Sequence, residues 1–279
     1  MAYQVIARRW RPQNFDELIG QDHITHTLKN AIEKKKIAQA YLFSGPRGVG
    51  KTSVSRIFAK ALRCPTAKGA VPCNECPECI AIAESRSIDV AEIDGASNNG
   101  VEAVRGIREN VAYGATCGRY KIYIIDEVHM LSISAFNALL KTLEEPPPHV
   151  IFIMATTEGQ KIPLTILSRC QRFEFRRLNQ EQVVDRLKYI LKEEGIRISE
   201  EGLRTIASGA DGSLRDALSL LDQVLSFFGE ESREIQLEDK QVVEALGVAD
   251  TNATSLYWDG LLKKDIKGCL KLIGDNYMA

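Results

Sequence analysis

The stretch YLFSGPRGVGKTS at residues 41–53 decides the fold of this 279-residue chain. It joins a short apolar strand pattern at 40–44 to a helical pattern at 53–62 through a loop with three glycines. The loop fits the spacing G-x-x-x-x-G-K-[ST], in which backbone N–H groups converge on phosphate oxygens at a helix N-terminus. The helix dipole also favours an anion at that point. The stretch therefore predicts a phosphate-binding loop between a parallel strand and a helix.

The side chains of this loop have separate predicted tasks. Lys51 is expected to reach the β- and γ-phosphates of a nucleotide, and Thr52 is expected to ligate Mg²⁺. The alternative is a chance match or a decayed loop that binds nothing, and the register of strand and helix with the loop disfavours it. The residues predicted to contact the nucleotide here are Gly45, Pro46, Arg47, Gly48, Val49, Gly50, Lys51, Thr52 and Ser53.

A second stretch, KIYIIDEVHM at residues 121–130, ends a buried strand pattern in two acids. Asp126 is expected to hold the magnesium shell, and Glu127 follows with a carboxylate that can polarise a water molecule. The alternative is two solvated acids at the end of a strand. Because the pair follows an apolar-rich strand and lies downstream of a complete phosphate loop, the sequence predicts nucleotide hydrolysis.

The chain changes character near residue 178. Before it, short apolar runs alternate with helix-sized segments, which indicates βαβ units and a mainly parallel sheet covered on both faces, an α/β fold. After it, apolar residues recur at helical spacing, which predicts a small all-helical second domain. Further helical patterns follow at about 239–246 and 252–279. The predicted strands are Ala40–Ser44, Val90–Ile93, Lys121–Ile125, Val150–Ala155 and Arg172–Phe175.

Four of the seven cysteines form the pattern C-x8-C-x2-C-x2-C, at Cys64, Cys73, Cys76 and Cys79. Four thiolates are the usual complement of a closed, structural zinc site, and the short spacings let one loop wrap the ion. An iron–sulfur cluster, redox thiols and unrelated cysteines are the alternatives. Pro65, Pro72 and Pro77 are expected to keep the segment out of a helix. The other cysteines are expected to be buried or incidental: Cys117, Cys170 and Cys269.

The composition is that of an ordinary globular protein. Hydrophobic residues make up 44% and charged residues 26%, which excludes collagen-like, disordered and low-complexity classes. No apolar run approaches the ~18 residues of a membrane-spanning helix, and no export signal is recognised, so a cytoplasmic location is expected. Residues 1–60 hold 11 Lys/Arg against 4 Asp/Glu, whereas residues 181–250 hold 8 against 16. This asymmetry permits a basic face on the first part without requiring one.

The phosphate loop, the acid pair and the helical segment behind them resemble the AAA+ ATPases. More narrowly, the chain resembles the gamma/tau family of bacterial DNA polymerase III, the motor subunits of the clamp loader. The resemblance implies a nucleotide-binding core at 1–178 with a zinc module at about 64–79, a helical lid at 179–242, and the start of a truncated helical collar at 243–279. The stretches that carry it include ARRWRP (7–12), AYLFSGPRGVGKTS (40–53), IIDEVHMLS (124–132), FNALLKTLEEPP (136–147), ATTEGQKIPLTILSRC (155–170) and GSLRDALSLLDQ (212–223).

The resemblance gives roles to residues that spacing alone leaves unassigned. Thr157 matches sensor 1, which helps to place the attacking water. Arg169 matches the arginine finger, which reaches the nucleotide of an adjacent subunit, and Arg215 matches sensor 2, which the lid carries to the phosphates of its own subunit. Ser213 is predicted to cap the helix that carries Arg215. Residues that border the nucleotide base in the family match Ala7, Arg11, Val49 and Leu214.

The resemblance implies a subunit that binds and hydrolyses ATP at subunit interfaces and so loads the sliding clamp onto primer–template DNA. Its implied partners are other clamp-loader subunits in a hetero-oligomeric ring, the sliding clamp and the DNA, with no membrane. The implied cofactors are ATP, Mg²⁺ and Zn²⁺. The chain is expected to belong to the DNA polymerase holoenzyme without a polymerase active site of its own.

Some functional alternatives stay open at this point. The loop at 95–100 precedes a helix with Arg105 and Arg108 and is a candidate DNA contact through free N–H groups, but a plain capped loop fits equally well. Another AAA+ enzyme, such as a branch-migration helicase, would be stimulated by DNA without a clamp. A nucleotide-gated scaffold is disfavoured by the intact motifs. A zinc-dependent DNA-binding module is disfavoured because no basic run adjoins the cysteines.

Overall fold

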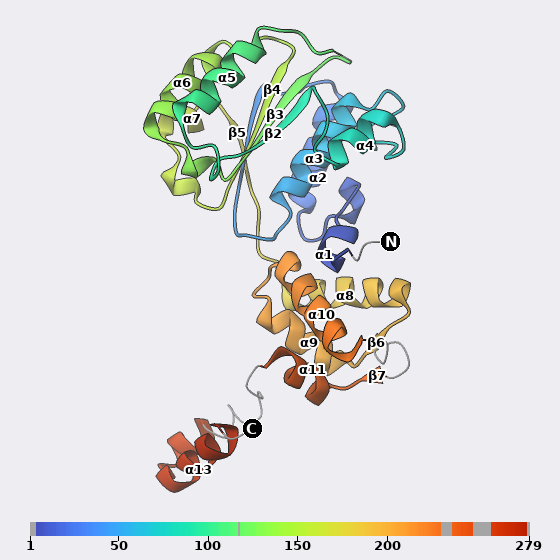
Figure 1. Cartoon of the computed structure of the whole chain (residues 1–279), viewed down its shortest axis with the longest axis vertical. Helices are drawn as coiled ribbons and strands as arrows, with labels where there is room; N and C mark the ends of the chain where they lie inside the picture. The colour runs from blue at the N-terminus through green and yellow to red at the C-terminus, as the bar shows by residue number, and fades with distance from the viewer. Residues whose placement is uncertain (1–3, 117, 230–235, 248–257, 278–279) are drawn as a thin grey trace. The chain divides into compact units, whose positions relative to one another are not determined.

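The computed structural model describes residues 4–116, 118–229, 236–247 and 258–277. The chain divides into two compact units, and Figure 1 labels their helices and strands. One unit runs from Arg11 to Asn179, and the other combines the residues up to Trp10 with those from Gln180 onward. The first unit contains the phosphate loop, the acid pair and the four clustered cysteines.

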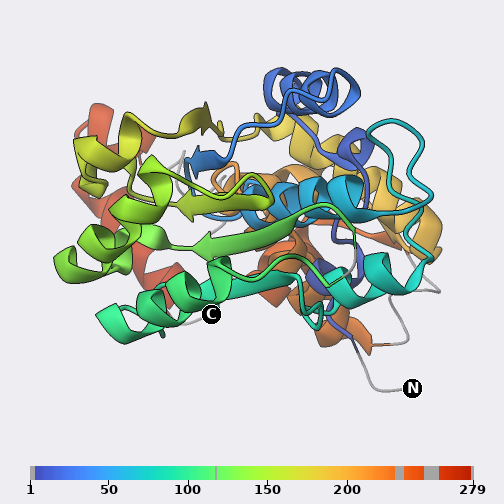
Figure 2. The same ribbon diagram turned by 90° about the horizontal axis from the view of Figure 1, so that it is seen from above.

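The unit from Arg11 to Asn179 is built on a five-stranded parallel sheet with the order β2-β3-β4-β1-β5. Figure 2 shows the strand arrows pointing the same way, so their carboxyl ends meet at one edge of the sheet. The predicted α/β fold with a parallel sheet is confirmed, and each strand lies within one residue of its predicted bounds. The strands are β1 (Ala40–Ser44), β2 (Val90–Asp94), β3 (Lys121–Asp126), β4 (Val150–Thr156) and β5 (Gln171–Glu174).

Helices cover both faces of this sheet, as Figure 1 shows. Successive side chains of a strand point to opposite faces, so Tyr41 and Phe43 of β1 join one buried apolar cluster while Leu42 joins the other. The first cluster packs against α2 (Asp22–Glu33), α3 (Lys51–Arg63) and α4 (Pro77–Ala83), and the second against α5 (Val101–Val111), α6 (Ile133–Glu144) and α7 (Leu164–Leu167). Short 3-10 turns occupy η1 (Phe15–Glu17), η2 (Val128–Met130) and η3 (Gly159–Lys161).

Helix α3 connects the two predicted ligand sites directly. It begins at Lys51, two residues earlier than predicted, because Gly50 takes a left-handed conformation (φ +106°) that turns the loop into the helix. It ends at Arg63, where Cys64 becomes extended and Pro65 lacks the N–H that a further turn needs. One rigid helix therefore leads from the phosphate loop to the first clustered cysteine.

The second unit is a helical bundle, as predicted, with one small addition. Its main helices bury apolar faces: α8 (Gln180–Glu194), α9 (Glu200–Gly209), α10 (Leu214–Phe228) and α11 (Asp239–Leu246). The unit also includes α1 (Ile6–Arg9) and α13 (Ile266–Tyr277). A two-residue parallel pair, β6 (Arg197–Ile198) with β7 (Gln236–Leu237), also occurs within the segment expected to be all helical. Of the pattern predicted at 252–279, residues 252–257 and 278–279 lie outside the described part.

The residues before Arg11 belong with the helices and not with the sheet. The indole N–H of Trp10 donates to Glu194 Oε1 at 2.7 Å, Arg9 pairs with the same carboxylate at 2.9 Å, and the Ile6 N–H contacts Asp222 at 3.5 Å. These contacts differ from the sequence-based division, which places the whole N-terminus in the core. The division into core, lid and collar by the boundaries 178 and 242 stays a prediction.

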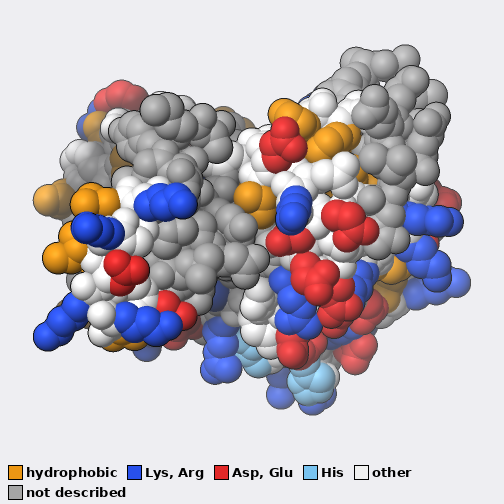
Figure 3. All heavy atoms as spheres, turned by 90° about the horizontal axis from the view of Figure 1, so that it is seen from below, with side chains coloured by type: hydrophobic (Ala, Val, Ile, Leu, Met, Phe, Trp, Pro, Cys, Tyr) orange, Lys and Arg blue, Asp and Glu red, His pale blue; other side chains and the backbone are white. Residues whose placement is uncertain are grey.

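No helix in the described ranges is long and apolar enough to cross a membrane. Figure 3 shows one face of the molecule, on which Asp and Glu side chains gather with Lys and Arg side chains among them. This face is therefore not a surface of one charge.

Candidate functional site

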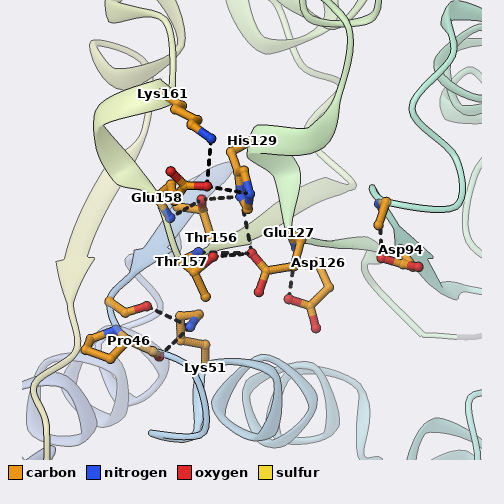
Figure 4. A network of polar contacts seen from close by, with 12 residues as sticks. Pro46, Lys51, Asp94, Asp126, Glu127, His129, Thr156, Thr157, Glu158 and Lys161 are labelled. Atoms are coloured by element: carbon orange, nitrogen blue, oxygen red, sulfur yellow. Dashed lines mark hydrogen bonds and ion pairs between the residues drawn. The ribbon is translucent and has the colours of Figure 1, made fainter.

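Four of the predicted catalytic residues, Lys51, Asp126, Glu127 and Thr157, lie where three parallel strands end. The phosphate loop follows β1, the acid pair closes β3, and Thr156 and Thr157 end β4, as Figure 4 shows. The pairing of Ser44 with Thr156, and of Ile125 with Met154, brings these ends together. In open α/β sheets ligands bind at this carboxyl edge.

The phosphate loop has the backbone that its glycines predict. Gly45 has φ +143°, and a Cβ there would lie 2.5 Å from the carbonyl oxygen of Phe175, so only glycine fits. Lys51 is 6% exposed, and its Nζ donates to the carbonyls of Gly45 (2.8 Å) and Pro46 (2.7 Å), as drawn in Figure 4. Burial lowers the pKa of Lys51, and the charges of Glu127 and Asp126 oppose that shift. The lysine cation is thus held beside the loop.

The acid pair and Thr52 meet as the magnesium prediction requires. The Thr52 hydroxyl donates to Asp126 Oδ2 at 2.6 Å, which places two hard oxygen ligands side by side. The residues present therefore fit Mg²⁺. Glu127 has a left-handed backbone (φ +45°), and its Oε2 accepts hydrogen bonds from the Thr157 N–H (3.0 Å) and hydroxyl (2.9 Å). The predicted sensor thus touches the predicted water-activating carboxylate.

His129 is a member of this site that the sequence analysis did not assign. Its side chain is 7% exposed, and its Nδ1 lies 3.0 Å from Thr156 Oγ1 and 3.2 Å from Glu127 Oε2. Its Nε2 lies 3.3 Å from Glu158 Oε1, and Glu158 in turn pairs with Lys161 at 2.8 Å. Figure 4 shows the resulting chain of polar contacts from Glu127 outward. One feature of the sequence indicates this role: a histidine follows the acid pair closely, in a turn of otherwise apolar residues.

The residues assigned by resemblance alone lie in different places. Arg11 donates from Nε to Ser53 Oγ at 3.2 Å, and Val49 is buried beside the loop. Arg169 follows α7, pairs with Glu144 at 2.7 Å and donates to the Thr165 carbonyl. The Ser213 hydroxyl accepts from the Asp216 N–H at 3.2 Å, which confirms the predicted cap of α10. The roles of three residues of the other unit stay predictions: Ala7, Leu214 and Arg215.

The loop at 95–100 is less suited to phosphate than predicted. The Asp94 carboxylate accepts from the Ala96 N–H at 3.1 Å and from the Ser97 hydroxyl at 2.5 Å, and the Asn98 N–H is bonded to the Asp94 carbonyl. These two N–H groups are therefore not free, which corrects the expectation. The bonds from Ser97 and Ala96 lower the pKa of Asp94, so a negative charge occupies the loop.

The four clustered cysteines converge on one point. Their sulfur atoms all lie within 4.8 Å of one another, and Cys73 and Cys79 are 4.0 Å apart. The edge of a tetrahedral Zn–S₄ site is about 3.8 Å for Zn–S bonds of ~2.3 Å. Backbone N–H groups of Cys73, Cys76 and Cys79 each point at the sulfur of another cysteine at 3.3–3.4 Å. The donor set therefore fits a closed tetrathiolate zinc site.

One part of the cysteine prediction is wrong. Pro77 does not keep the segment out of a helix, because it is the first residue of α4 and Cys79 lies within that helix. Proline is well suited to the first helical position, and the Cys76 sulfur accepts the Cys79 N–H as an N-cap. Hydrogen bonds from Thr66 and the backbone lower the pKa of Cys73 to about 6, while burial raises that of Cys79.

The fold and this site define the class of the protein. A parallel sheet carrying a phosphate loop and an acid pair at one edge is the architecture of the P-loop ATPases of the AAA+ type. The chain is similar in fold to a structure described as the Thermotoga maritima RuvB Holliday junction branch migration motor, with a TM-score of 0.65 and 18% identity, covering 90% of this chain and 79% of that one. At this identity the likeness concerns the fold alone.

Sequence comparison identifies the family. A model described as "DNA polymerase III, delta subunit" matches residues 20–179, and one described as "DNA polymerase III clamp loader subunit, ATPase lid domain" matches residues 182–230. The chain is 53% identical to DNA polymerase III subunit tau of Bacillus subtilis, over 95% of this chain and 46% of that protein. It is 44% identical to subunit gamma of Buchnera aphidicola subsp. Acyrthosiphon pisum, over 98% and 74%. The chain belongs to the gamma/tau subunit family of DNA polymerase III.

The chain covers different shares of its relatives. It spans less than half of the tau subunits of Bacillus subtilis and Escherichia coli, 46% and 42% of their lengths. The two family models match residues 20–179 and 182–230, which include the phosphate loop, the acid pair and the four clustered cysteines.

Proposed function

We propose that this chain is an ATP-binding and ATP-hydrolysing motor subunit of a DNA polymerase III clamp loader, which uses ATP to load a sliding clamp onto primer–template DNA. The observation that carries the proposal is the meeting of Lys51, the Thr52–Asp126 pair and the Glu127–Thr157 pair at one edge of the sheet. Membership in the gamma/tau family supplies the clamp-loading context.

Each group of residues has a distinct task in this proposal. The N–H groups of the loop and the first turn of α3 bind the nucleotide phosphates, and Lys51 neutralises their charge. Thr52 and Asp126 hold Mg²⁺, which neutralises charge on the phosphates when bound. Glu127 orients and polarises the attacking water, with Thr157 fixing the position of its carboxylate. Cys64, Cys73, Cys76 and Cys79 hold Zn²⁺ in a structural site.

Two arginines complete the proposal for an assembled ring with other loader subunits. Arg169 acts on the nucleotide of a neighbouring subunit, where a positive charge stabilises the transition state by roughly 10³–10⁵-fold in related systems. Its exposure, in the turn between α7 and β5, suits a residue that acts outside its own subunit. Arg215 acts from the helical lid on the phosphates of its own subunit, together with Ala7 and Leu214 near the base.

The decisive experiment is steady-state ATP hydrolysis by this chain mixed with partner loader subunits. We expect stimulation that requires the sliding clamp and a primer–template together, and none when Lys51→Ala replaces the wild type. Arg169→Ala should retain ATP binding and lose the stimulation. Stimulation by DNA without the clamp would contradict the proposal and favour a branch-migration motor. Hydrolysis that clamp and DNA leave unchanged would contradict it as well.

A further inference from the structure

The residues from Arg11 to Leu18 form a strap that lies against the phosphate loop. At one end Arg11 donates to Ser53 Oγ at 3.2 Å. At the other end the Leu18 side chain lies beside Gly50, where an added Cβ would be in ordinary van der Waals contact with Leu18 Cδ2 at 3.4 Å. A small pocket lies between the strap and α3. The strap therefore lies against Gly50, directly before Lys51, and against Ser53, two residues after it.

Two apolar side chains, Phe15 and Leu18, anchor the strap in the core, and the residues before them lack such an anchor. Phe15 and Leu18 are buried, but the segment from Arg11 to Asn14 is polar and half-buried. Within the strap, the Gln13 N–H donates to Glu17 at 2.7 Å and the Asn14 amide donates to Glu17 at 2.9 Å. Besides this apolar packing and the contact with Ser53, hydrogen bonds to two residues outside the strap hold residues 11–14 over α3.

Those outside partners are Lys60 of α3 and Asn74 of the cysteine loop. Lys60 is 2% exposed, and its Nζ donates to Gln13 Oε1 at 2.8 Å and to Asn74 Oδ1 at 2.6 Å. The other half of the Asn74 amide donates from Nδ2 to Asn14 Oδ1 at 3.0 Å. The Asn74 amide thus connects Lys60 to the strap at Asn14, beside the direct bond from Lys60 to Gln13.

The conformation of Asn74 depends on its neighbours in the cysteine loop. It follows Cys73 directly, its φ of +62° lies in the left-handed region, and its backbone is hydrogen-bonded to Cys79. Asparagine tolerates this region better than most residues, but the conformation is maintained by the surrounding structure. A metal held by Cys73, Cys76 and Cys79 would fix the backbone on both sides of Asn74.

We propose that Asn74 is a positioning residue through which zinc in the cysteine site holds the strap against the phosphate loop and so raises the affinity for nucleotide. The proposal rests on the nucleotide and zinc sites proposed above. The zinc site contributes to nucleotide binding without touching the nucleotide. An ordered cysteine loop fixes Asn74, which hydrogen-bonds Asn14 directly and Gln13 through Lys60. Loss of zinc loosens the strap, and the phosphate loop loses the contacts at Ser53 and Gly50.

The test uses the full chain and three variants. Asn74→Gly removes the amide without straining a left-handed backbone. Asn14→Ala removes its partner on the strap and leaves the cysteine loop intact. Glu75→Ala, an exposed neighbour in the same loop, is the matched control. For each protein the measurements are zinc content, the dissociation constant of a fluorescent ATP analogue with Mg²⁺, and hydrogen–deuterium exchange of residues 11–18.

We expect Asn74→Gly and Asn14→Ala to keep one zinc per chain and to bind the analogue roughly 2- to 10-fold more weakly, as the loss of one net hydrogen bond predicts. Exchange in the strap should become faster in both, and Glu75→Ala should match the wild type. Removing zinc with a chelator should weaken binding in the wild type and cause no further loss in Asn74→Gly, since both changes break the same connection.

Two results would overturn the proposal. One is wild-type affinity and strap protection in Asn74→Gly and Asn14→Ala with zinc retained. The other is an equal, additive effect of chelation in the wild type and in Asn74→Gly, because zinc would then act by another route. Failure of the proposed function looks different: the wild-type chain would bind no analogue with zinc at full occupancy, and the inference would fall with it.

Discussion

The two ends of α3 carry sites of opposite character. At the N-terminal end the phosphate loop offers backbone N–H groups and Lys51 to an anion, and the helix dipole is favourable there. At the C-terminal end Cys64 begins a set of four sulfur ligands suited to a cation. The same dipole is unfavourable for thiolates at that end. The backbone of the helix therefore favours anion binding at the first site, while the second site needs positively charged side chains to offset the unfavourable helix dipole.

Lys60 supplies the positive charge, which interacts with Cys79 and Cys64, and Arg63 fixes the cysteine segment to α3. The Arg63 side chain is 1% exposed and pairs with Asp89 at 2.8 Å and with Glu78 of α4 at 2.6 Å, and it also donates to the Tyr120 carbonyl. Glu78 lies between two of the cysteines, so this buried arginine joins α3, the cysteine segment and the start of β2. The comparison teaches that one end of α3 is specified by a local motif and the other by contacts distant in sequence.

The largest effect on stability is expected from Arg63→Met. The change leaves the carboxylate of Asp89, 4% exposed, without its buried cation, and breaking a buried pair in this way costs about 3–5 kcal/mol. Urea denaturation of the zinc-loaded protein would measure the loss of unfolding free energy. A loss below about 1 kcal/mol would mean that the C-terminal end of α3 does not depend on this pair.

The second-largest effect is expected at the N-terminal end of α3, where a substitution should weaken ATP binding and leave stability nearly unchanged. Lys51→Ala should weaken ATP binding by about 2–3 kcal/mol, or roughly 30- to 150-fold, because a charged donor to the phosphates is lost. Unfolding free energy should change little, since the Lys51 Nζ donates to two carbonyls of the phosphate loop itself. Isothermal titration with ATP and Mg²⁺ measures the affinity, and Lys141→Ala, exposed on α6, is the control. Equal affinities in the two variants would contradict the phosphate-loop assignment.

The two ends of α3 also show which parts of the fold and of the site the sequence predicts and which it does not. The strands were predicted within one residue because each is a short apolar run between turns, and the phosphate loop and cysteines were recognised from spacing within one segment. His129 contacts Glu158, and Asn74 contacts Asn14. These residues are far apart in the chain, so no local sequence pattern predicts the contacts. The role of Pro77 was misjudged because proline breaks a helix only after its first turn.

The third prediction compares the stability effects of replacing a glycine that the fold requires and one that it does not. Gly45→Ala forces a Cβ against the Phe175 carbonyl at a φ of +143°, which should cost about 1–3 kcal/mol of unfolding free energy and impair ATP binding. Gly106 lies inside α5 with no atom within 4 Å of its would-be Cβ. Gly106→Ala should therefore stabilise the protein by up to ~1 kcal/mol through helix propensity. Thermal denaturation of both variants checks the two signs, and the reverse order would contradict the loop geometry.

The smallest effect is expected from Arg56→Met, on the same helix as Arg63. Arg56 also makes a two-pronged ion pair, donating to Glu92 at 2.7 and 2.8 Å, but both side chains are about one-fifth exposed. Partial hydration makes the loss of such a pair far less costly than that of a buried one, and we expect about 1 kcal/mol or less. Urea denaturation beside Arg63→Met gives a direct comparison on one helix. A larger loss for Arg63→Met would agree with its deeper burial and its second carboxylate partner. Equal losses in the two variants would contradict the rule that burial sets the cost of breaking an ion pair on this helix.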